Sequence, residues 1–412
     1  MSATRPRSHR SGPVGIARHG RLRTSKPALT VLKFVAAALA VVLVSGASVA
    51  AIALNQLNSN IKSVALVGET AGPPPDLGSF DGGFNILVVG SDTREGQGGI
   101  GGKSDSVLND VNILIHVSED QTNAVAISFP RDLVVPIPSC PKTDGKGSTP
   151  AMAGQPINVT LFYGGLPCTV LTVEALTGLD IPFAALITFQ GVIQMSTAVG
   201  GVPVCVNGPM KDPYTGINLP AAGTYNLSGA EALAFLRSRH GVGDGSDLGR
   251  ISSQQVYLSS LIRTVKSNDT LTDFSKLYSL ATVASQNVTL SNSLKNLNTM
   301  VSMALVLKDI PLEKITFVQY PSTTGVGGIY SGKVAPLAGP AAALVAKIKA
   351  DEPFAINSGT GRGSVIDPNA PPTAAEPAPS GSATAAPDDG AEVIPGVLGQ
   401  TAAEYTCSKV NN

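Results

Sequence analysis

The chain has 412 residues with 29 basic and 29 acidic side chains, so its formal net charge is zero. Hydrophobic residues make up 43% of it, which excludes a wholly disordered chain and allows a sizeable buried core. Four cysteines exclude a disulfide-dense scaffold, and the lack of a Cys-x-x-Cys pair argues against a structural zinc site.

The charges are unevenly distributed along the chain. Residues 1–33 contain eight basic side chains and no acidic one, because the first acidic residue is Glu69. The rest of the chain therefore carries an excess of eight acidic side chains. A basic head on an acidic body is not the profile of a nucleic-acid-binding domain, so no nucleic-acid partner is expected.

An apolar segment follows the basic head. Residues 34–54 carry no charge, and a helix of 21 residues spans the roughly 30 Å core of a bilayer. The positive-inside rule predicts a single-pass protein of the cell membrane, with residues 1–33 in the cytoplasm and the body outside. A cleaved signal peptide with a site at Ser48–Ala50 is the alternative, although both segments are long for one. This topology explains the basic head more simply than nucleic-acid binding does.

Composition divides the chain into six regions. A stalk ending in Gly-Pro-Pro-Pro precedes the body, and a segment dominated by Pro, Ala, Ser, Gly and Asp follows it. That segment predicts disorder because it lacks large apolar side chains, and the residues after it are too few to fold alone. The predicted regions are a cytoplasmic head (1–33), a transmembrane helix (34–54), a stalk (55–83), a globular domain (84–356), a disordered linker (357–390) and a tail (391–412).

Apolar runs of strand length alternate with helical patterns in the body. Several runs are continuous, as in buried central strands, and the longest helical pattern is amphipathic. Ser228 and Glu231 have the spacing of a capping box at a helix start. The alternation predicts an α/β layer fold. The predicted strands are 85–89, 111–117, 124–128, 186–189 and 202–206, and the predicted helices are 230–237 and 251–265.

Polar residues follow two of these strands. Asp92 and Arg94 come just after the first, and Arg131 and Asp132 come just after the third. Ligands of open α/β sheets bind at the carboxyl ends of the strands, so these residues are candidates for a site. A local ion pair in a turn would also explain each pair.

A third polar cluster joins the two predicted helices. Arg237 and Arg239 are two residues apart, so they converge only where a helix ends, which the following glycines permit. With Arg250 they place three guanidiniums near one loop, and guanidiniums bind phosphate oxygens through paired hydrogen bonds. The alternative is a network of ion pairs with Asp244 and Asp247.

Other reaction types lack support in the sequence. The body contains two histidines, His240 and His116, and the latter lies inside an apolar strand. The chain has no Gly-x-Ser-x-Gly motif, no Gly-rich phosphate loop and no dinucleotide-binding motif. Aspartates and arginines at strand and helix ends suit metal-assisted phosphoryl transfer, in which carboxylates hold Mg²⁺ and guanidiniums neutralise phosphate.

Six short motifs follow one another in the body: NILVVGSDTR (85–94), NDVNILIHV (109–117), SFPRDL (128–133), YGG (163–165), ALAFLRSRH (232–240) and DLGRI (247–251). In this order they resemble the LytR–CpsA–Psr family of cell-wall glycopolymer ligases. The Ala-rich, Lys-poor composition and the run VGDGSDLGR (242–250) resemble its actinobacterial members. The resemblance covers about residues 84–266. It implies an α/β/α sandwich with a central mixed sheet and a long apolar lipid pocket, with 84–356 as the catalytic domain.

The resemblance also implies a reaction. Members of this family move a glycopolymer from a polyprenyl-pyrophosphate carrier onto peptidoglycan, forming a phosphodiester and releasing polyprenyl phosphate. The expected activity is thus a Mg²⁺-dependent phosphotransferase with pyrophosphate hydrolysis as a side activity, and arabinogalactan is the expected polymer in an actinobacterium. The alternatives are a catalytically weak protein that binds polyprenyl pyrophosphate or the wall, and a membrane-bound transcriptional attenuator. The small cytoplasmic head, which shows no DNA-binding fold, argues against the attenuator.

Individual roles follow from the resemblance. Asp92 and Asp110 would bind Mg²⁺, with Mn²⁺ as an alternative, and Asp132 would act as a base or orient an arginine. The residues implied to bind pyrophosphate are Arg94, Arg131, Arg237, Arg239 and Arg250. The residues implied in catalysis are Asp92, Arg131, Asp132 and Arg239.

Two positions depart from the family pattern. Leu108 stands two residues before Asp110, where the family often has arginine, and Lys103 or Arg94 would compensate. Pro156 stands before Ile-Asn, where the family often has lysine. The lysines that would replace its charge are Lys142 and Lys146.

Residues 157–206 contain few charges and many apolar side chains, which fits either a lipid pocket or an ordinary core. The apolar residues concerned are Leu161, Phe162, Leu171, Leu176, Phe183, Leu186, Ile187, Phe189, Val192, Ile193 and Met195.

The cysteines suit an oxidising compartment outside the membrane. Cys140 and Cys168 flank one long loop and are predicted to pair. Cys205 with Cys407 would then tie the tail to the body. Four cysteines allow three connectivities, so the other pairings stay open.

Overall fold

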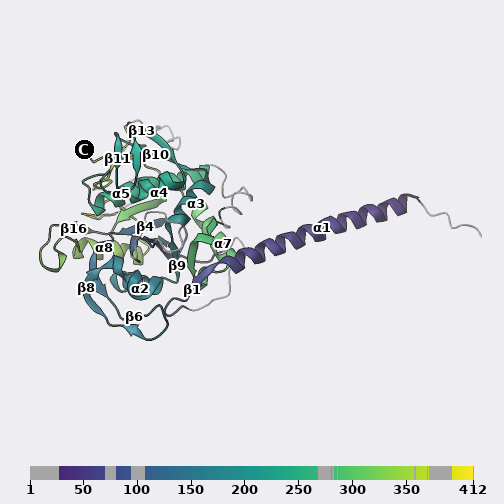
Figure 1. Cartoon of the computed structure of the whole chain (residues 1–412), viewed down its shortest axis with the longest axis horizontal. Helices are drawn as coiled ribbons and strands as arrows, with labels where there is room; N and C mark the ends of the chain where they lie inside the picture. Colours follow the sequence, from purple (N-terminus) through teal and green to yellow (C-terminus); the bar gives the residue numbers. More distant parts are fainter. Residues whose placement is uncertain are drawn as a thin grey trace, which may run out of the picture. The chain divides into compact units, whose positions relative to one another are not determined.

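The computed structural model forms two compact units, Met1–Asn55 and Gln56–Asn412 (Figure 1). The residues that it describes are 27–69, 80–93, 107–267, 280, 283–284, 286–356, 359–368, 370 and 392–411.

Helix α1 (Pro27–Asn60) contains the predicted transmembrane segment. Its stretch Val31–Val49 is long and apolar enough to cross a membrane, and none of it is buried in the structure. The stretch Ile157–Thr177, which includes helix α2 (Thr160–Thr177), meets the same test of length and composition. Half of it is buried, however, and Val173 of α2 is fully buried in the core. We therefore assign α2 to the core of the domain and α1 as the candidate membrane span.

A mixed sheet of eight described strands forms the centre of the second unit. Neighbours run parallel at β1–β14, β2–β9 and β4–β15, and antiparallel at the other four pairings. The continuous apolar run predicted for the third strand is buried at every residue of β4. In order across the sheet, the strands are β1 (Lys62–Val64), β14 (Val288–Ser291), β9 (Phe183–Ile187), β2 (Phe84–Ser91), β3 (Asn109–Val117), β4 (Ala124–Phe129), β15 (Ile315–Gln319) and β21 (Gly399–Thr401).

Helices cover both faces of this sheet (Figure 1). Leu87 and Leu114 point to the face on which α2 and α8 pack, whereas Ile113 and Ala126 point to the face on which α5 and α7 pack. Because side chains alternate along a strand, each strand supplies both cores. The fold is therefore the predicted α/β/α sandwich with a central mixed sheet. Besides α1 and α2, the helices are α3 (Phe189–Val199), α4 (Gly229–Arg237), α5 (Asp247–Ser267), α7 (Leu297–Asp309) and α8 (Ala338–Lys349).

A smaller sheet packs on the outer side of α5. Its strands are, in order, β13 (Gly223–Leu227), β10 (Val202–Val206), β22 (Thr406–Ser408) and β19 (Ser364–Ile366). Helix α5 thus lies between two sheets and is buried on most sides. Two of its buried polar side chains find partners there, since Ser253 shares a hydrogen bond with Ser408 and Ser259 accepts one from Gln400.

Short strand pairs and turns complete the domain. The pairs are β5 (Val134–Ile137) with β8 (Met152–Pro156), β6 (Cys140–Pro141) with β7 (Ser148–Thr149), β11 (Met210–Asp212) with β12 (Ile217–Leu219), β16 (Ser322–Thr324) with β17 (Val334–Pro336) and β18 (Phe354–Ala355) with β20 (Glu392–Val393). The 3₁₀ turns are η1 (Ile157–Val159), η2 (Asn292–Leu294), η3 (Leu312–Lys314) and η4 (Gly328–Tyr330).

Two local predictions are wrong in detail. The predicted strand 186–189 is shifted, because β9 ends at Ile187 and Thr188 caps α3 by accepting the N–H of Gly191. Ser228 does occupy the N-cap of α4, but its side chain makes no capping hydrogen bond. The N–H of Gly229 instead donates to Ser196 Oγ.

The domain boundaries also need correction. The predicted stalk (55–83) contributes β1 to the edge of the central sheet, and the predicted linker (357–390) contributes β19. The tail (391–412), predicted to be too short to fold alone, supplies β20, β21 and β22. β1, β20, β21 and β22 each pair with a strand of the body, and β19 pairs with β22 of the tail. Residues 371–390 of the linker lie outside the described residues.

Candidate functional site

The ends of three strands meet at one edge of the central sheet. Ser91 at the carboxyl end of β2 pairs with Asn109 at the start of β3, and β4 ends beside β3 at Phe129. Just beyond, the N–H of Leu108 donates to Asp92 Oδ1 over 2.7 Å, and the N–H of Asp92 donates to the carbonyl of Leu108. The residues predicted after these strands therefore lie at one place.

Arg131 is the centre of this cluster. Its Nη1 forms an ion pair with Asp110 Oδ1, and its Nε lies 3.8 Å from Asp132 Oδ2. Its backbone N–H donates to Asp247 Oδ2 over 2.9 Å. Burial alone would lower the pKa of Arg131, but the carboxylates of Asp110, Asp132, Asp247 and Asp92 raise it above its ordinary value. The guanidinium is thus held charged among four carboxylates.

Asp247 and Arg250 form a second, more deeply buried pair in the first turn of α5. Arg250 Nη2 lies 2.6 Å from Asp247 Oδ1, and the two side chains are 7% and 3% exposed. The same Nη2 donates to the backbone carbonyl of Asp110 over 2.8 Å. Arg250 Nε and Arg131 Nε are buried donors without a hydrogen-bond partner among the described residues. They are available to the oxygens of an anionic ligand.

An apolar cavity opens beside this cluster, between the sheet and helices α3, α4 and α5. Its volume is about 160 Å³. Asp110, Arg237 and Arg250 line it together with apolar side chains, and the Arg237 guanidinium lies 4.4 Å from the centre of the Phe189 ring. Its other lining residues are Val88, Gly90, Ser91, Val111, Ile113, Ile187, Thr188, Val192, Leu233, Leu236, Gln254 and Leu258.

The segment predicted to line a lipid pocket contributes only partly to this cavity. Ile187, Phe189 and Val192 line it, whereas Leu166 and Val170 of the same segment lie on α2 and pack in the core. A pattern of apolar residues could not separate these two roles, because both faces of the sheet are buried.

Arg239 lies apart from the cavity lining. It is exposed on the loop between α4 and α5 (residues 238–246), and its Nε donates to the carbonyl of Gly245 over 3.0 Å. The start of this loop is fixed by the buried Asp212 carboxylate, which accepts the backbone N–H groups of Arg239, His240 and Gly241. The structure therefore brings Arg237 and Arg250 to one cavity but presents Arg239 on the loop.

Four further charged residues were predicted to act at the site. Arg94 and Lys103 lie outside the described residues. Lys142 and Lys146 are exposed, and none of the ion pairs among the described residues involves them. Lys333, which no motif in the sequence indicates, also reaches the cluster, since its Nζ lies 3.3 Å from Asp132 Oδ1.

His116 and Asp244 have structural partners. The imidazole of His116 contacts Asn85 Oδ1 at 2.9 Å and Asp351 Oδ1 at 2.8 Å. Asp244 pairs with Arg362, 3.0 Å away. The alternative for the third cluster, ion pairs of its arginines with Asp244 and Asp247, is thus present only in part. Asp247 pairs with Arg250, whereas Asp244 pairs with Arg362 from outside the cluster.

Replacing Asp212 by asparagine is expected to make the stability of the domain less dependent on acid. Burial alone would raise the pKa of Asp212, but hydrogen bonds from Ser238 and from backbone N–H groups lower it below its ordinary value. A lowered pKa contributes stability that is present above about pH 4 and is lost as the pH falls through the folded-state pKa. The urea midpoint of D212N should be lower than that of the wild type at pH 7. It should then fall less steeply than that of the wild type as the pH is lowered from 7 to 3.

The exposed carboxylate of Asp144 provides the control for this measurement. Asp144→Asn should retain the pH dependence of the wild type. If D212N and the wild type lose the same stability between pH 5 and 3, the Asp212 carboxylate does not supply the acid-sensitive contacts of the loop.

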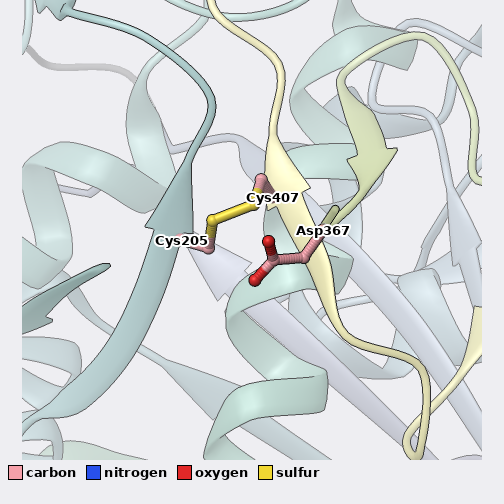
Figure 2. A group of neighbouring side chains, drawn as sticks. All are labelled: Cys205, Asp367 and Cys407. Atoms are coloured by element: carbon pink, nitrogen blue, oxygen red, sulfur yellow. A yellow bond between two sulfur atoms is a disulfide. The ribbon is translucent and has the colours of Figure 1, made fainter. Parts of the chain in front are cut away.

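Both predicted disulfides are present in the structure. Cys140 is bonded to Cys168, and Cys205 to Cys407. Figure 2 shows the Asp367 carboxylate beside the second bond. Among the described residues, this is the group of three potential metal ligands whose atoms lie within 4.8 Å of one another. Because its sulfurs are bonded to each other, they are not thiolate ligands, and we do not assign a metal site there.

The sequence that forms this fold matches a known family. The model of the LytR_cpsA_psr family matches residues 41–339 of the chain. The chain belongs to the LytR–CpsA–Psr family. This confirms the family that the six motifs resembled.

Relatives in two bacterial groups agree. The cell wall biosynthesis protein LcpA of Corynebacterium glutamicum is 30% identical over 274 residues, which are 60% of this chain and 52% of LcpA. The chain spans about half the length of LcpA and of LcpB (44%) from the same organism. TagT of Bacillus subtilis, a polyisoprenyl-teichoic acid–peptidoglycan teichoic acid transferase, is 27% identical over 70% of this chain and 86% of its own length.

Solved structures confirm the fold. The LytR-Csp2A-Psr enzyme from Actinomyces oris superposes with a TM-score of 0.51 at 22% identity, over 70% of this chain and 95% of that one. TagV of B. subtilis superposes with a TM-score of 0.50 at 24% identity, over 66% and 99% of the two chains. At these identities the likeness concerns the α/β/α architecture alone.

Proposed function

We propose that this chain transfers a glycopolymer from a polyprenyl-pyrophosphate carrier to peptidoglycan at the outer face of the cell membrane. The observation that carries the proposal is the apolar cavity with Asp110, Arg237 and Arg250 in its lining and Arg131 beside it. An apolar cavity suits a hydrocarbon chain, and adjacent guanidiniums suit the pyrophosphate joined to it.

The residues would share the work of phosphoryl transfer. The guanidiniums of Arg131, Arg237 and Arg250 bind the pyrophosphate and stabilise the charge that develops on it. A hydroxyl of peptidoglycan attacks the phosphorus that bears the glycan, so that a new P–O bond forms while the bond to the bridging oxygen breaks. Polyprenyl phosphate leaves with that bonding pair. Asp132 takes the hydroxyl proton or orients Arg131, with which it is in contact.

The carboxylates at this edge of the sheet support Mg²⁺ as the proposed cofactor. Asp92 directly follows β2, Asp110 lies on the neighbouring strand β3, and carboxylate oxygens are ligands that Mg²⁺ prefers. These two residues would hold the ion, with Mn²⁺ as the alternative. The bound ion would neutralise charge on the pyrophosphate. Arg94, which lies outside the described residues, and Arg239 remain further candidates for pyrophosphate binding.

The names of the relatives support a wall polymer as substrate. TagT is named for teichoic acid transfer and LcpA for cell wall biosynthesis. Given the resemblance to actinobacterial members, we propose arabinogalactan as the polymer here. Helix α1 would anchor the protein, with the basic head in the cytoplasm and the domain outside.

Geranyl pyrophosphate hydrolysis by the full-length protein in detergent tests the proposed chemistry. Wild type should release phosphate in Mg²⁺, and EDTA should stop the release. Arg131→Ala should lower the rate at least about 100-fold, because removing one preorganised charge from a transition state costs that much. Lys347→Ala, which removes a cation paired with exposed glutamates, should retain the wild-type rate.

Transfer itself needs lipid-linked glycan and a peptidoglycan acceptor, with the phosphodiester product detected by mass spectrometry. Binding of the lipid without release or transfer by wild type would instead identify a polyprenyl-pyrophosphate-binding protein.

A further inference from the structure

Lys333 reaches the site from a distant part of the chain. It directly precedes β17, and its N–H donates to the carbonyl of Tyr330 in a tight turn. The next residue, Val334, is buried, pairs with Leu133 in a bridge and donates its N–H to the carbonyl of Asp132 over 3.1 Å. The backbone of Lys333 is therefore fixed against the residue that follows Arg131.

The side chain of Lys333 is aimed at the same residue. Its Nζ lies 3.3 Å from Asp132 Oδ1, while the other carboxylate oxygen of Asp132 lies 3.8 Å from Arg131 Nε. Asp132 is 14% exposed and Lys333 is 41% exposed. The carboxylate of Asp132 thus lies between the half-buried guanidinium of Arg131 and the more exposed ammonium group of Lys333.

The charges around Arg131 explain why a second cation is useful here. Four carboxylates act on Arg131, and the ion pairs at the cluster supply two further cations, Arg250 and Lys333. Arg250 forms its ion pair with Asp247. Asp110 occupies Arg131 Nη1, and Arg131 Nε is 3.8 Å from Asp132, too far for a hydrogen bond. Without Lys333, Asp132 would therefore have only this long contact with Arg131 to orient its carboxylate.

We propose that Lys333 is a positioning residue that holds Asp132 against Arg131 and thereby fixes both for phosphoryl transfer. The proposal rests on the function proposed above and deepens it, because it adds a residue from outside the six motifs. Lys333 acts through Asp132 and does not need to touch the substrate. Its loss should therefore lower kcat and leave KM nearly unchanged.

A double-mutant cycle on the full-length protein tests this. Lys333→Met should lower kcat of geranyl pyrophosphate hydrolysis about 10-fold or more with KM changed less than about threefold, the split expected for a group that acts in the transition state. In the Asp132→Asn background the same change should have no further effect, because the partner of Lys333 is gone. Lys333→Arg, which keeps the charge, should restore at least half of the wild-type kcat.

Lys349→Met is the matched control, since Lys349 is an exposed lysine on α8. It should leave kcat unchanged. Full activity of Lys333→Met, or equal losses in the wild-type and Asp132→Asn backgrounds, would overturn the positioning role. A wild type that does not hydrolyse the probe would overturn the proposed function instead. If Lys333→Met fails to fold, Lys333→Gln in the same cycle decides the question.

Discussion

Replacing Arg250 by methionine is expected to destabilise the folded domain by about 3–5 kcal/mol and to abolish activity. Arg250 and Asp247 are buried together, and their charged atoms are 2.6 Å apart. Without the guanidinium of Arg250, the Asp247 carboxylate stays buried and loses its ion-pair partner, although the backbone N–H of Arg131 still donates to it. Leaving a buried charge uncompensated costs more than the pair itself contributes. Urea unfolding of wild type and variant measures the loss.

An exposed ion pair from the same region gives the matched control. Arg362 and Asp244 are 3.0 Å apart but 41% and 43% exposed. Arg362→Met should therefore cost less than about 1 kcal/mol. The double variant Asp247→Leu/Arg250→Met should regain part of the stability, because the unpaired charge is removed, yet it should stay inactive. A loss below about 1 kcal/mol for Arg250→Met would contradict the account of a buried pair.

The parts of the fold that follow from local sequence were predictable. The strand 202–206 is found unchanged as β10, and the apolar run 124–128 is the buried strand β4. Arg131 and Asp132 were predicted at a strand end, and the hydrogen-bonded pairing of β2, β3 and β4 brings them to Asp92 and Asp110. The periodicity of apolar residues and the polar residues at strand ends depend on a few neighbouring positions, so both can be recognised in a single sequence.

The parts that depend on distant pairing were not predictable. Lys333 lies 201 residues from Asp132 in the sequence, and no local pattern marks it as part of the site. The tail was too short to assign any structure, yet β21 extends the central sheet and β22 joins the small one. Arg239 fits the motif but is held on a loop by Asp212, because a backbone turn and not the spacing decides its direction.

The tail also holds the loop that joins α4 to α5. The N–H of Gly243 donates to the carbonyl of Lys409 over 2.8 Å, and the N–H of Asn411 donates to the carbonyl of Gly241 over 3.1 Å. These bonds fix residues 238–246 from one side, while Asp212 fixes their start. The loop connects the helices that carry Arg237 and Arg250, so the tail contributes to the geometry of the site.

The bond between Cys205 and Cys407 keeps that tail in place. Replacing both cysteines by serine is expected to cost about 5 kcal/mol, against about 3.5 kcal/mol for the pair Cys140 and Cys168, because the chain-entropy loss grows with the closed loop. The two bonds close segments of 202 and 28 residues. Urea unfolding of the two double variants measures the difference.

Hydrogen exchange of the same two variants separates a local role from general destabilisation. Removing the Cys205–Cys407 bond should speed exchange of the amides in residues 238–246 at pH 7 without urea. The tail that hydrogen-bonds to Gly241 and Gly243 would then lose the covalent anchor of β22. Removing Cys140–Cys168 should leave those amides protected. That bond joins β6 to α2, whereas the hydrogen bonds that hold the loop come from Asp212, Lys409 and Asn411. Equal exchange in both variants would mean that pairing of β22 with β10 and β19 alone is enough to hold the loop.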